Sequence, residues 1–134
     1  MSIIMYTDGG ARGNPGPAAA GVVIQKDGET IATIGQFLGK SLTNNWAEYQ
    51  ALILGLEKLT ELGYTDETVE VRMDSELIVK QMKGEYRVKH ADLKTLYRQV
   101  QELMDGLATV RFVHIPRAQN KEADALVNEA LDAQ

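Results

Sequence analysis

Four acidic side chains stand where a carboxylate could do chemistry. Asp8 follows an apolar run at residues 3–7 and precedes a glycine-rich stretch that continues to Pro17. Asp74 follows a segment in which apolar and charged residues alternate, and Glu48 and Asp124 lie near the expected starts of two helices. A carboxylate beside backbone that a ligand can approach closely suits a metal ion or a phosphate. The simpler alternative for Asp8 is a turn, because Asp-Gly is a common turn pair.

Each of the other three acids also has a structural explanation. Glu48 could close a capping box with Asn45, although it shares a helix face with Leu52 that can lean toward a sheet. Asp74 could cap the helix that follows it, and Asp124 could interact favourably with a helix dipole. If all four reach one pocket, their mutual repulsion requires cations. Oxygen ligands favour Mg²⁺ or Mn²⁺, and two such ions about 4 Å apart can clamp a phosphodiester.

The elements that must position these acids follow from hydrophobic spacing. Strands are expected at 3–7, 18–26, 30–38, 69–73 and 110–115, the first three joined by turns. Helices are expected after residue 45 as far as Gly63, at 76–83, at 91–104 and from about 120 onward. This order predicts one mixed α/β sheet flanked by helices, with the fourth and fifth strands parallel to the first. If the fourth strand pairs with the first, Asp8 and Asp74 lie at adjacent strand ends, where open α/β sheets bind ligands.

Length and composition limit the class of protein. With 134 residues, 44% of them apolar, the chain is expected to form a single domain over residues 1–134. The absence of cysteine excludes thiolate chemistry and zinc–cysteine sites. No basic segment precedes a long apolar run, and no run approaches membrane-spanning length. We therefore expect a soluble, cytoplasmic protein without membrane contact, and a monomer.

The distribution of charge is uneven. A net charge of −5 argues against a protein that coats nucleic acid without specificity. Half of the 14 Lys and Arg residues nevertheless lie within residues 72–98. They include Lys80, Lys83, Arg87, Lys89, Lys94 and Arg98. This run could track phosphates or could be a solvated helix face.

Other phosphate-binding and nucleophile motifs fail. Gly39-Lys40-Ser41 looks like the end of a P-loop, but Ile34 stands where the loop needs a glycine. The glycines after Asp8 lack the dinucleotide-binding spacing, and no serine has the neighbours of a nucleophile motif.

Four motifs in a fixed order cover essentially the whole chain. They are Thr7-Asp8-Gly9-Gly10 with Gly13-Asn14-Pro15-Gly16, then Thr43-Asn44-Asn45-Trp46-Ala47-Glu48, then Met73-Asp74-Ser75-Glu76, then His114 with Asn120-Lys121-Glu122-Ala123-Asp124. In these motifs the chain resembles ribonuclease H of type 1, in a short form without the basic protrusion of some bacterial members. The resemblance implies a ribonuclease H-like fold, with strand order 3-2-1-4-5, and an endonuclease that hydrolyses the RNA strand of RNA/DNA hybrids. It also implies a two-metal-ion mechanism with Mg²⁺, for which Mn²⁺ could substitute, and products with 5′-phosphate and 3′-hydroxyl ends.

The resemblance also assigns roles to residues. Asp8, Glu48, Asp74 and Asp124 match the family's metal-binding, catalytic carboxylates. His114 matches a loop histidine that assists proton transfer or product release. The alternative for His114 is a strand-end histidine partly buried beside its neighbours. His90 has no counterpart and is expected on the surface.

Substrate selection depends on the 2′-hydroxyl, which is read in the wide minor groove. Positions that match the family's contacts to the minor groove and sugars are Gly10, Asn14, Asn44, Asn45 and Glu76. Thr43 matches part of a pocket for a DNA-strand phosphate. Helix capping is the alternative role for Thr43 and Asn44, and it is compatible with substrate contact.

Two features depart from the family pattern. Glu76 replaces a glutamine of many relatives, so an acceptor-only group stands where the relatives have a donor. The short segment between Lys83 and Leu93 carries few cations, which predicts weak, salt-sensitive hybrid binding. Two alternatives remain open at this point. One is a related metal nuclease that acts on other strands, including double-stranded RNA, and the other is a catalytically silent nucleic-acid-binding module.

Overall fold

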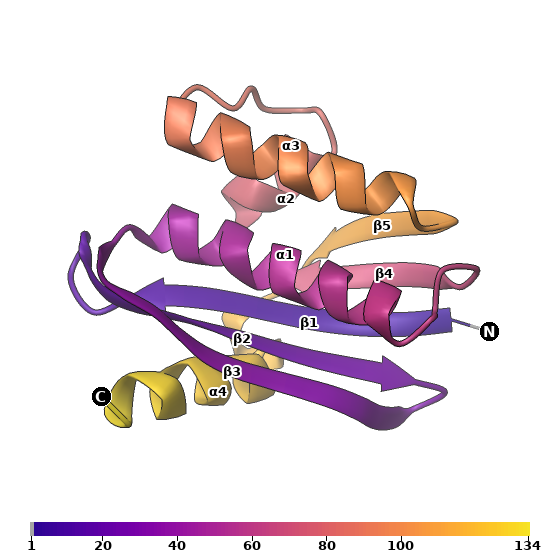
Figure 1. Ribbon diagram of the computed structural model, residues 1–134, viewed down its shortest axis with the longest axis horizontal. Helices are drawn as coiled ribbons and strands as arrows, with labels where there is room; N and C mark the ends of the chain where they lie inside the picture. Colours follow the sequence, from indigo (N-terminus) through magenta and orange to yellow (C-terminus); the bar gives the residue numbers. More distant parts are fainter. Residues whose placement is uncertain (1) are drawn as a thin grey trace.

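A five-stranded sheet in the order β3-β2-β1-β4-β5 forms the centre of the computed structural model, which describes residues 2–134 (Figure 1). The strands are β1 (Ser2–Ala11), β2 (Gly16–Lys26), β3 (Glu29–Leu42), β4 (Thr68–Met73) and β5 (Thr109–His114). The helices are α1 (Asn44–Glu61), α2 (Glu76–Met82), α3 (Ala91–Asp105) and α4 (Lys121–Asp132), with a 3-10 turn at Arg117–Gln119 before α4. The predicted mixed sheet and its strand order are confirmed.

The pairing of the strands brings two of the acids together. β1 pairs antiparallel with β2, and β2 with β3, whereas β4 runs parallel to both β1 and β5. The last pair between β1 and β4 is Thr7 with Met73. Asp8 and Asp74 therefore follow this pair on neighbouring strands, as the sequence predicted.

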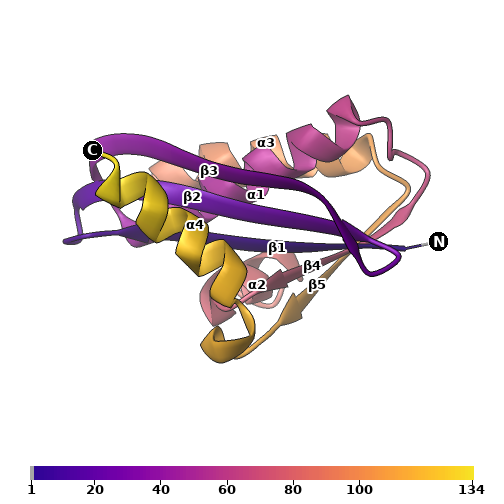
Figure 2. The ribbon, with the colours of Figure 1, turned by 90° about the horizontal axis from the view of Figure 1, so that it is seen from below.

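The helices lie on both faces of the sheet. α1, α2 and α3 lie on one face, whereas α4 crosses the opposite face beneath β1, β2 and β3 (Figures 1 and 2). The end of α1 that carries Glu48 and the start of α4 thus approach the same strands from opposite sides. No helix within residues 2–134 combines the length and the apolar content needed to cross a membrane.

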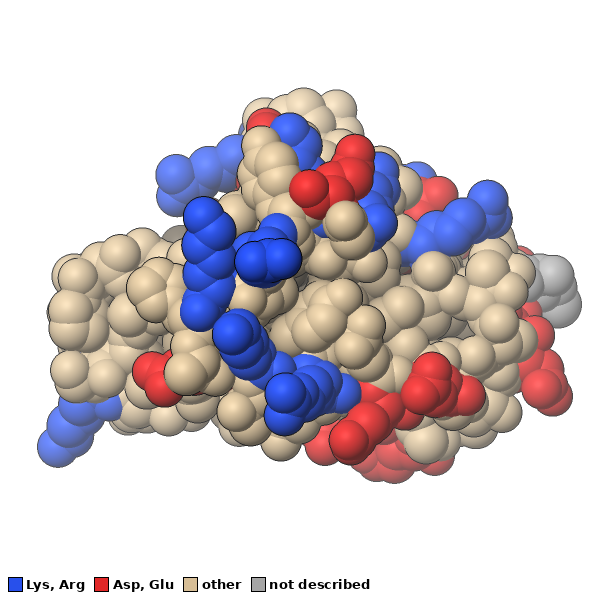
Figure 3. Space-filling model, turned by 90° about the horizontal axis from the view of Figure 1, so that it is seen from above, with Lys and Arg blue, Asp and Glu red and all other residues tan. Residues whose placement is uncertain are grey.

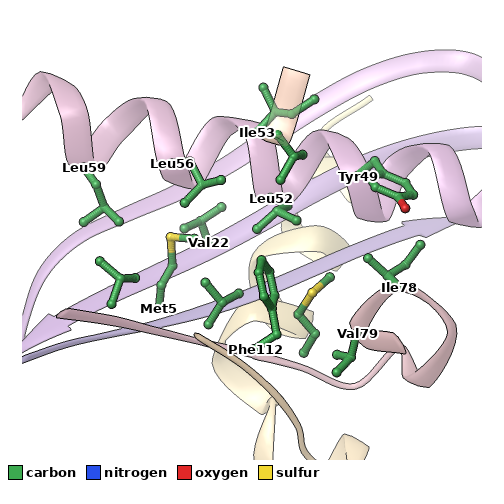
Figure 4. Close-up of a cluster of buried hydrophobic side chains, with 14 of the residues drawn as sticks. Met5, Val22, Tyr49, Leu52, Ile53, Leu56, Leu59, Ile78, Val79 and Phe112 are labelled. Atoms are coloured by element: carbon green, nitrogen blue, oxygen red, sulfur yellow. The ribbon is translucent and has the colours of Figure 1, made fainter. Parts of the chain in front are cut away.

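The main core lies between the sheet and α1 (Figure 4). Met5 and Val22 project from the sheet toward Leu52 and Leu56 of α1, and all four are fully buried. Burying side chains of this size stabilises the fold by about 1.5–3 kcal/mol each. The core therefore fixes α1 firmly on the strands that carry the acids.

Strands β1 and β3 end four residues later than predicted. β1 does not end before Asp8, because Gly9, Gly10 and Ala11 continue to pair with the alanines at 18–20 of β2. These residues are small, so both strands stay close and the ladder continues. The interpretation of Asp8-Gly9 as a turn is therefore wrong, and only residues 12–15 separate β1 from β2. β3 likewise continues beyond residue 38 to Leu42.

Candidate active site

Three carboxylates converge at the point where β1 and β4 part. Asp8, Glu48 and Asp74 each offer an oxygen, and these atoms all lie within 4.8 Å of one another. Asp8 and Glu48 are buried, and Asp74 is half-buried. Two strands and one helix therefore bring together side chains that are up to 66 residues apart, the separation of Asp8 from Asp74.

Gly9 explains how Glu48 reaches this point. A Cβ at Gly9 would overlap the backbone carbonyl of Ala47, so only glycine lets the start of α1 lie directly on β1. The backbone N–H of Gly9 donates a hydrogen bond of 2.5 Å to Oε1 of Glu48. The glycine thus both admits the helix and anchors the carboxylate.

Gly21 plays the corresponding role on the other face of the sheet. It pairs with Asp8 across the β1–β2 ladder, and a Cβ there would overlap the carbonyl of Ala123. α4 therefore lies directly on β2, and its next residue, Asp124, is close enough to Asp8 to raise the pKa of that carboxyl. All four acids line one cavity of about 630 Å³.

The structural alternatives for two of these acids are wrong. Thr43 caps α1, since its Oγ1 accepts a hydrogen bond of 3.2 Å from the N–H of Trp46, and Glu48 forms no capping box. Ser75 rather than Asp74 caps α2, with its Oγ accepting from the N–H of Ile78. Asp124 does lie in the first turn of α4, as expected for a favourable helix dipole.

The electrostatics of the cluster favour protonation when no cation is bound. Burial, followed by the charge of Asp74 and the hydrogen bond with Asp124, raises the pKa of Asp8 to about 8. Burial and the charges of Asp8 and Asp74 also raise the pKa of Glu48, against a smaller opposing contribution from the Gly9 N–H. With a pKa of about 8, Asp8 is mostly protonated at neutral pH unless a bound cation supplies positive charge.

A hard divalent cation fits this donor set. The converging ligands are carboxylate oxygens, which Mg²⁺ and Mn²⁺ prefer. Neutralising the cluster removes the repulsion that raises the two pKa values. The burial of Asp8 and Glu48 and their mutual repulsion therefore agree with a metal site.

Sequence reasoning missed Arg117, which lines the same cavity. It belongs to the 3-10 turn between β5 and α4, and its positive charge lowers the pKa of Asp8 against the other contributions. Its only signal in the sequence is a basic residue that directly follows Pro116, the residue expected to end the fifth strand. That signal is common and points to no particular function.

The residues matched to substrate contacts fall into two groups. Gly10, Asn44 and Asn45 line the acidic cavity. Asn14 and Asn44 also join the β1–β2 connection to α1, because Asn44 Oδ1 accepts from the N–H of Ala11 (2.8 Å) and Asn14 Oδ1 accepts from the N–H of Asn44 (3.0 Å). Thr43 is exposed beside them at the start of α1.

The second group lies toward α2 and the end of β5. Glu76 is exposed and forms an ion pair of 3.0 Å with Lys80, whose Nζ lies 4.9 Å from the ring centre of Tyr86. The hydrogen bond and charge of Lys80, with a smaller contribution from His114, lower the pKa of Glu76. His114 ends β5 and is exposed, so the alternative of a partly buried strand-end histidine is wrong as to its burial. His90 is exposed, as expected.

Basic side chains gather on the helical face of the molecule, whereas acidic side chains gather near one of its edges (Figure 3). Within residues 2–134, ion pairs with carboxylates involve five of the Lys and Arg residues. Those without such a pair between α2 and the middle of α3 are Lys83, Arg87, Lys89, Lys94 and Arg98, and all are exposed. Apart from Lys80, which pairs with Glu76, the predicted basic run is therefore an exposed surface without ion pairs among residues 2–134.

Comparison with known proteins gives a consistent result. Residues 6–130 match a protein-family model described as reverse transcriptase-like. The chain is 45% identical over 128 residues to ribonuclease HI of Halobacterium salinarum, covering 95% of this chain and 63% of that protein. It is also 45% identical over 135 residues to a bifunctional protein of Mycobacterium tuberculosis, covering 99% of this chain but 36% of that protein. The chain thus spans about a third to just under two thirds of these curated relatives.

A solved structure is similar over nearly the whole chain. The crystal structure of LC11-RNase H1 in complex with an RNA/DNA hybrid superimposes with a TM-score of 0.94 at 51% identity. The match covers 98% of each chain.

Proposed function

The chain belongs to the ribonuclease H family, and from that premise we propose that it hydrolyses the RNA strand of RNA/DNA hybrids as a metal-dependent endonuclease. The convergence of Asp8, Glu48 and Asp74 within 4.8 Å carries this proposal. The hybrid bound to LC11-RNase H1 supports the choice of substrate.

The proposed metal ligands are Asp8, Glu48, Asp74 and Asp124. These four carboxylates would hold two Mg²⁺ ions, for which Mn²⁺ could substitute. Two such ions would supply activation of a water molecule for attack on phosphorus and stabilisation of the 3′-oxygen that departs as the P–O3′ bond breaks, so the products would carry 5′-phosphate and 3′-hydroxyl ends. The protein's own contribution is to hold the carboxylates close together, with Glu48 fixed by the Gly9 N–H.

Two cationic or titratable side chains complete the proposed site. His114 would assist proton transfer or product release, because it is exposed and lies beside Met73, the residue before Asp74, in the β4–β5 pair. Arg117 would attract a phosphodiester to the cavity and help to keep Asp8 ionised.

The proposed reading of the RNA strand uses groups near the start of α1. Asn14 and Asn44 use their amide oxygens within the protein, and none of the hydrogen bonds among residues 2–134 uses their NH₂ groups. These donors, with Asn45 and the backbone at Gly10, suit contacts with 2′-hydroxyls and base edges in the minor groove. Thr43 would contact a phosphate of the DNA strand.

Glu76 gives a specific reason for a second candidate, a nuclease that also cuts double-stranded RNA. A glutamate offers only acceptors when ionised, and here its carboxylate is paired with Lys80. The contact that Glu76 makes with a nucleic-acid strand would therefore differ from the contact of a glutamine. Whether the protein requires a DNA strand opposite the RNA, or also accepts a second RNA strand, can be tested at this residue.

The test offers labelled RNA/DNA hybrid, single-stranded RNA, double-stranded RNA and DNA duplex to the same protein. With Mg²⁺ we expect cleavage of the RNA strand of the hybrid, and with a chelator none. Asp8→Asn and Asp74→Asn should remain folded and lose cleavage, because each removes a metal-binding charge. Asp132→Asn is the matched control, since Asp132 is exposed and, among residues 2–134, forms an ion pair with Arg12 alone.

Each possible pattern of cleavage distinguishes between the candidate functions. Intact hybrid under all metal conditions would contradict the proposal and favour a binding module without catalysis. Equal cleavage of hybrid and double-stranded RNA would favour the second candidate. If Glu76→Gln restored preference for the hybrid, Glu76 would be the cause. The single domain, the monomeric state and the cytoplasmic location stay predictions from the sequence.

A further inference from the structure

Asn120 has an unusual place at the start of α4. It is 1% exposed and occupies the residue before the helix, where an asparagine side chain commonly accepts a hydrogen bond from the helix backbone. Here the side chain makes no such bond. Only its backbone carbonyl takes part, by accepting a hydrogen bond of 3.1 Å from the N–H of Asp124. The amide is therefore available for another role.

The side chain of Asn120 joins the two strands that carry acids. Its Nδ2 donates to the carbonyl of Thr7 (2.9 Å) and to Oδ2 of Asp74 (3.3 Å). Thr7 is the residue before Asp8 and the last residue of β1 that pairs with β4. One amide thus contacts the peptide unit before one acid and the carboxylate of a second, and it lies one helical turn before Asp124.

An amide suits this place better than the other polar side chains. Both partners are acceptors, so the nitrogen of the amide must face them, and asparagine provides two donors without charge. A lysine or arginine would bring a positive charge that competes with a cation, and an aspartate would provide no donor. The Oδ1 of Asn120 is buried and has no hydrogen-bond partner within residues 2–134. An unpartnered buried acceptor is destabilising, and an apolar side chain would avoid that cost.

We propose that Asn120 is a positioning residue for the metal site. It holds the carboxylate of Asp74 and the backbone before Asp8 in the arrangement that binds a divalent cation. The proposal rests on the proposed function to the extent that this function requires Mg²⁺ in the carboxylate cluster. Residues that hydrogen-bond the ligands of a metal typically change its affinity by 10–100-fold when they are removed.

The test measures Mg²⁺ binding without nucleic acid. The melting temperature is followed over a range of Mg²⁺ concentrations for the wild type, Asn120→Ala and Asn120→Ser. Gln119→Ala is the matched control, because it removes an amide from the adjacent, exposed residue of the same turn. We expect Asn120→Ala to need about 10–100 times more Mg²⁺ for half of the stabilisation, and Gln119→Ala to behave as the wild type.

Cleavage of hybrid provides the second measurement. The Mg²⁺ concentration for half-maximal rate should rise by the same factor, while KM for the hybrid at saturating Mg²⁺ stays within about twofold of the wild type. An Asn120→Ala protein with a lower melting temperature but unchanged Mg²⁺ dependence would overturn the proposal, since the residue would then be only structural.

Asn120→Ser tests the proposal even if the Asn120→Ala protein does not fold. Its hydroxyl can retain one of the two hydrogen bonds, so a smaller shift in the same direction is expected, and an unchanged Mg²⁺ dependence again overturns the proposal. A wild-type protein that cuts no hybrid would contradict the proposed function, whereas the comparison of Mg²⁺ binding would still decide the role of Asn120.

Discussion

Replacing Asp8 by asparagine should stabilise the metal-free protein while it abolishes cleavage. The side chain keeps its size, but the charge that burial, Asp74 and Asp124 disfavour is lost. With a pKa of about 8 in the folded state and 3.8 as the ordinary value, Asp8 ionises in the unfolded chain at pH 7 but must take up a proton on folding, which lowers the free energy of unfolding by about 4 kcal/mol. For a chain of this length, regaining that free energy raises the melting temperature by roughly 10–15 °C.

The sign of the pH dependence follows from the direction of the shift. Because the pKa of Asp8 is raised in the folded state, its contribution to stability is fully present below about pH 4. This contribution is lost as the pH rises to about 8. The gain from Asp8→Asn should therefore be below about 1 kcal/mol at pH 4 and largest at pH 8 or above. Bound Mg²⁺ stabilises the wild type and should narrow the difference at neutral pH.

Urea unfolding with a chelator at pH 4, 7 and 8.5 measures these differences. Asp132→Asn is the control, because its exposed ion pair with Arg12 contributes at most about 1 kcal/mol. An Asp8→Asn protein that is no more stable than the wild type at pH 8.5 would refute the reasoning. Such a result would mean that Asp8 ionises in the folded protein at little cost in stability, and the electrostatic argument for a bound cation would then fail.

Three further substitutions test other parts of the site. Gly9→Ala should lower both the free energy of unfolding and the affinity for Mg²⁺, because its Cβ would overlap the backbone of α1. Gly10→Ala has room for a Cβ and should change the free energy of unfolding by about 1 kcal/mol or less; urea unfolding with and without Mg²⁺ compares the two variants. Arg117→Ala should raise the pKa of Asp8 in the folded state further, so the loss of metal-free stability should still begin near pH 4 but extend to higher pH and become larger in total, and Arg117→Lys should have a smaller effect; urea unfolding with a chelator at several pH values compares them. Lys94→Ala should reduce the slope of log K for hybrid binding against log salt concentration by about one unit, measured with a chelator present. Lys58→Ala is the control and should leave the slope unchanged, because Lys58 is paired with Glu61.

The sequence predicted the parts of the fold that local patterns determine. Val69, Val71 and Met73 alternate with polar residues and face the core, and Leu52 and Leu56 recur at helical spacing on the buried side of α1. These periods depend on the geometry of a single strand or helix. The adjacency of two acids followed from the same reasoning, because parallel strands place their carboxyl ends at one edge of the sheet.

The parts that the sequence did not predict depend on contacts between elements. Nothing local indicated that β1 continues through Gly9, because this requires the small residues of β2 opposite it. The anchoring of Glu48 by a backbone N–H likewise depends on how closely α1 approaches the strand. Arg117 and Asn120 act across distances of about a hundred residues along the chain, so no spacing rule points to them.

Gly9 and Gly21 show how the fold keeps mutually repelling carboxylates close together at the candidate site. Each removes a side chain that would keep a helix away from the sheet, one on either face beside Asp8. The two helices then bring Glu48 and Asp124 toward a carboxylate that is already next to Asp74. Larger residues would separate the charges and relieve the repulsion, so this arrangement lowers the stability of the metal-free protein. A site that binds a cation has a use for such an arrangement, because the cation recovers on binding the free energy that the fold loses without it.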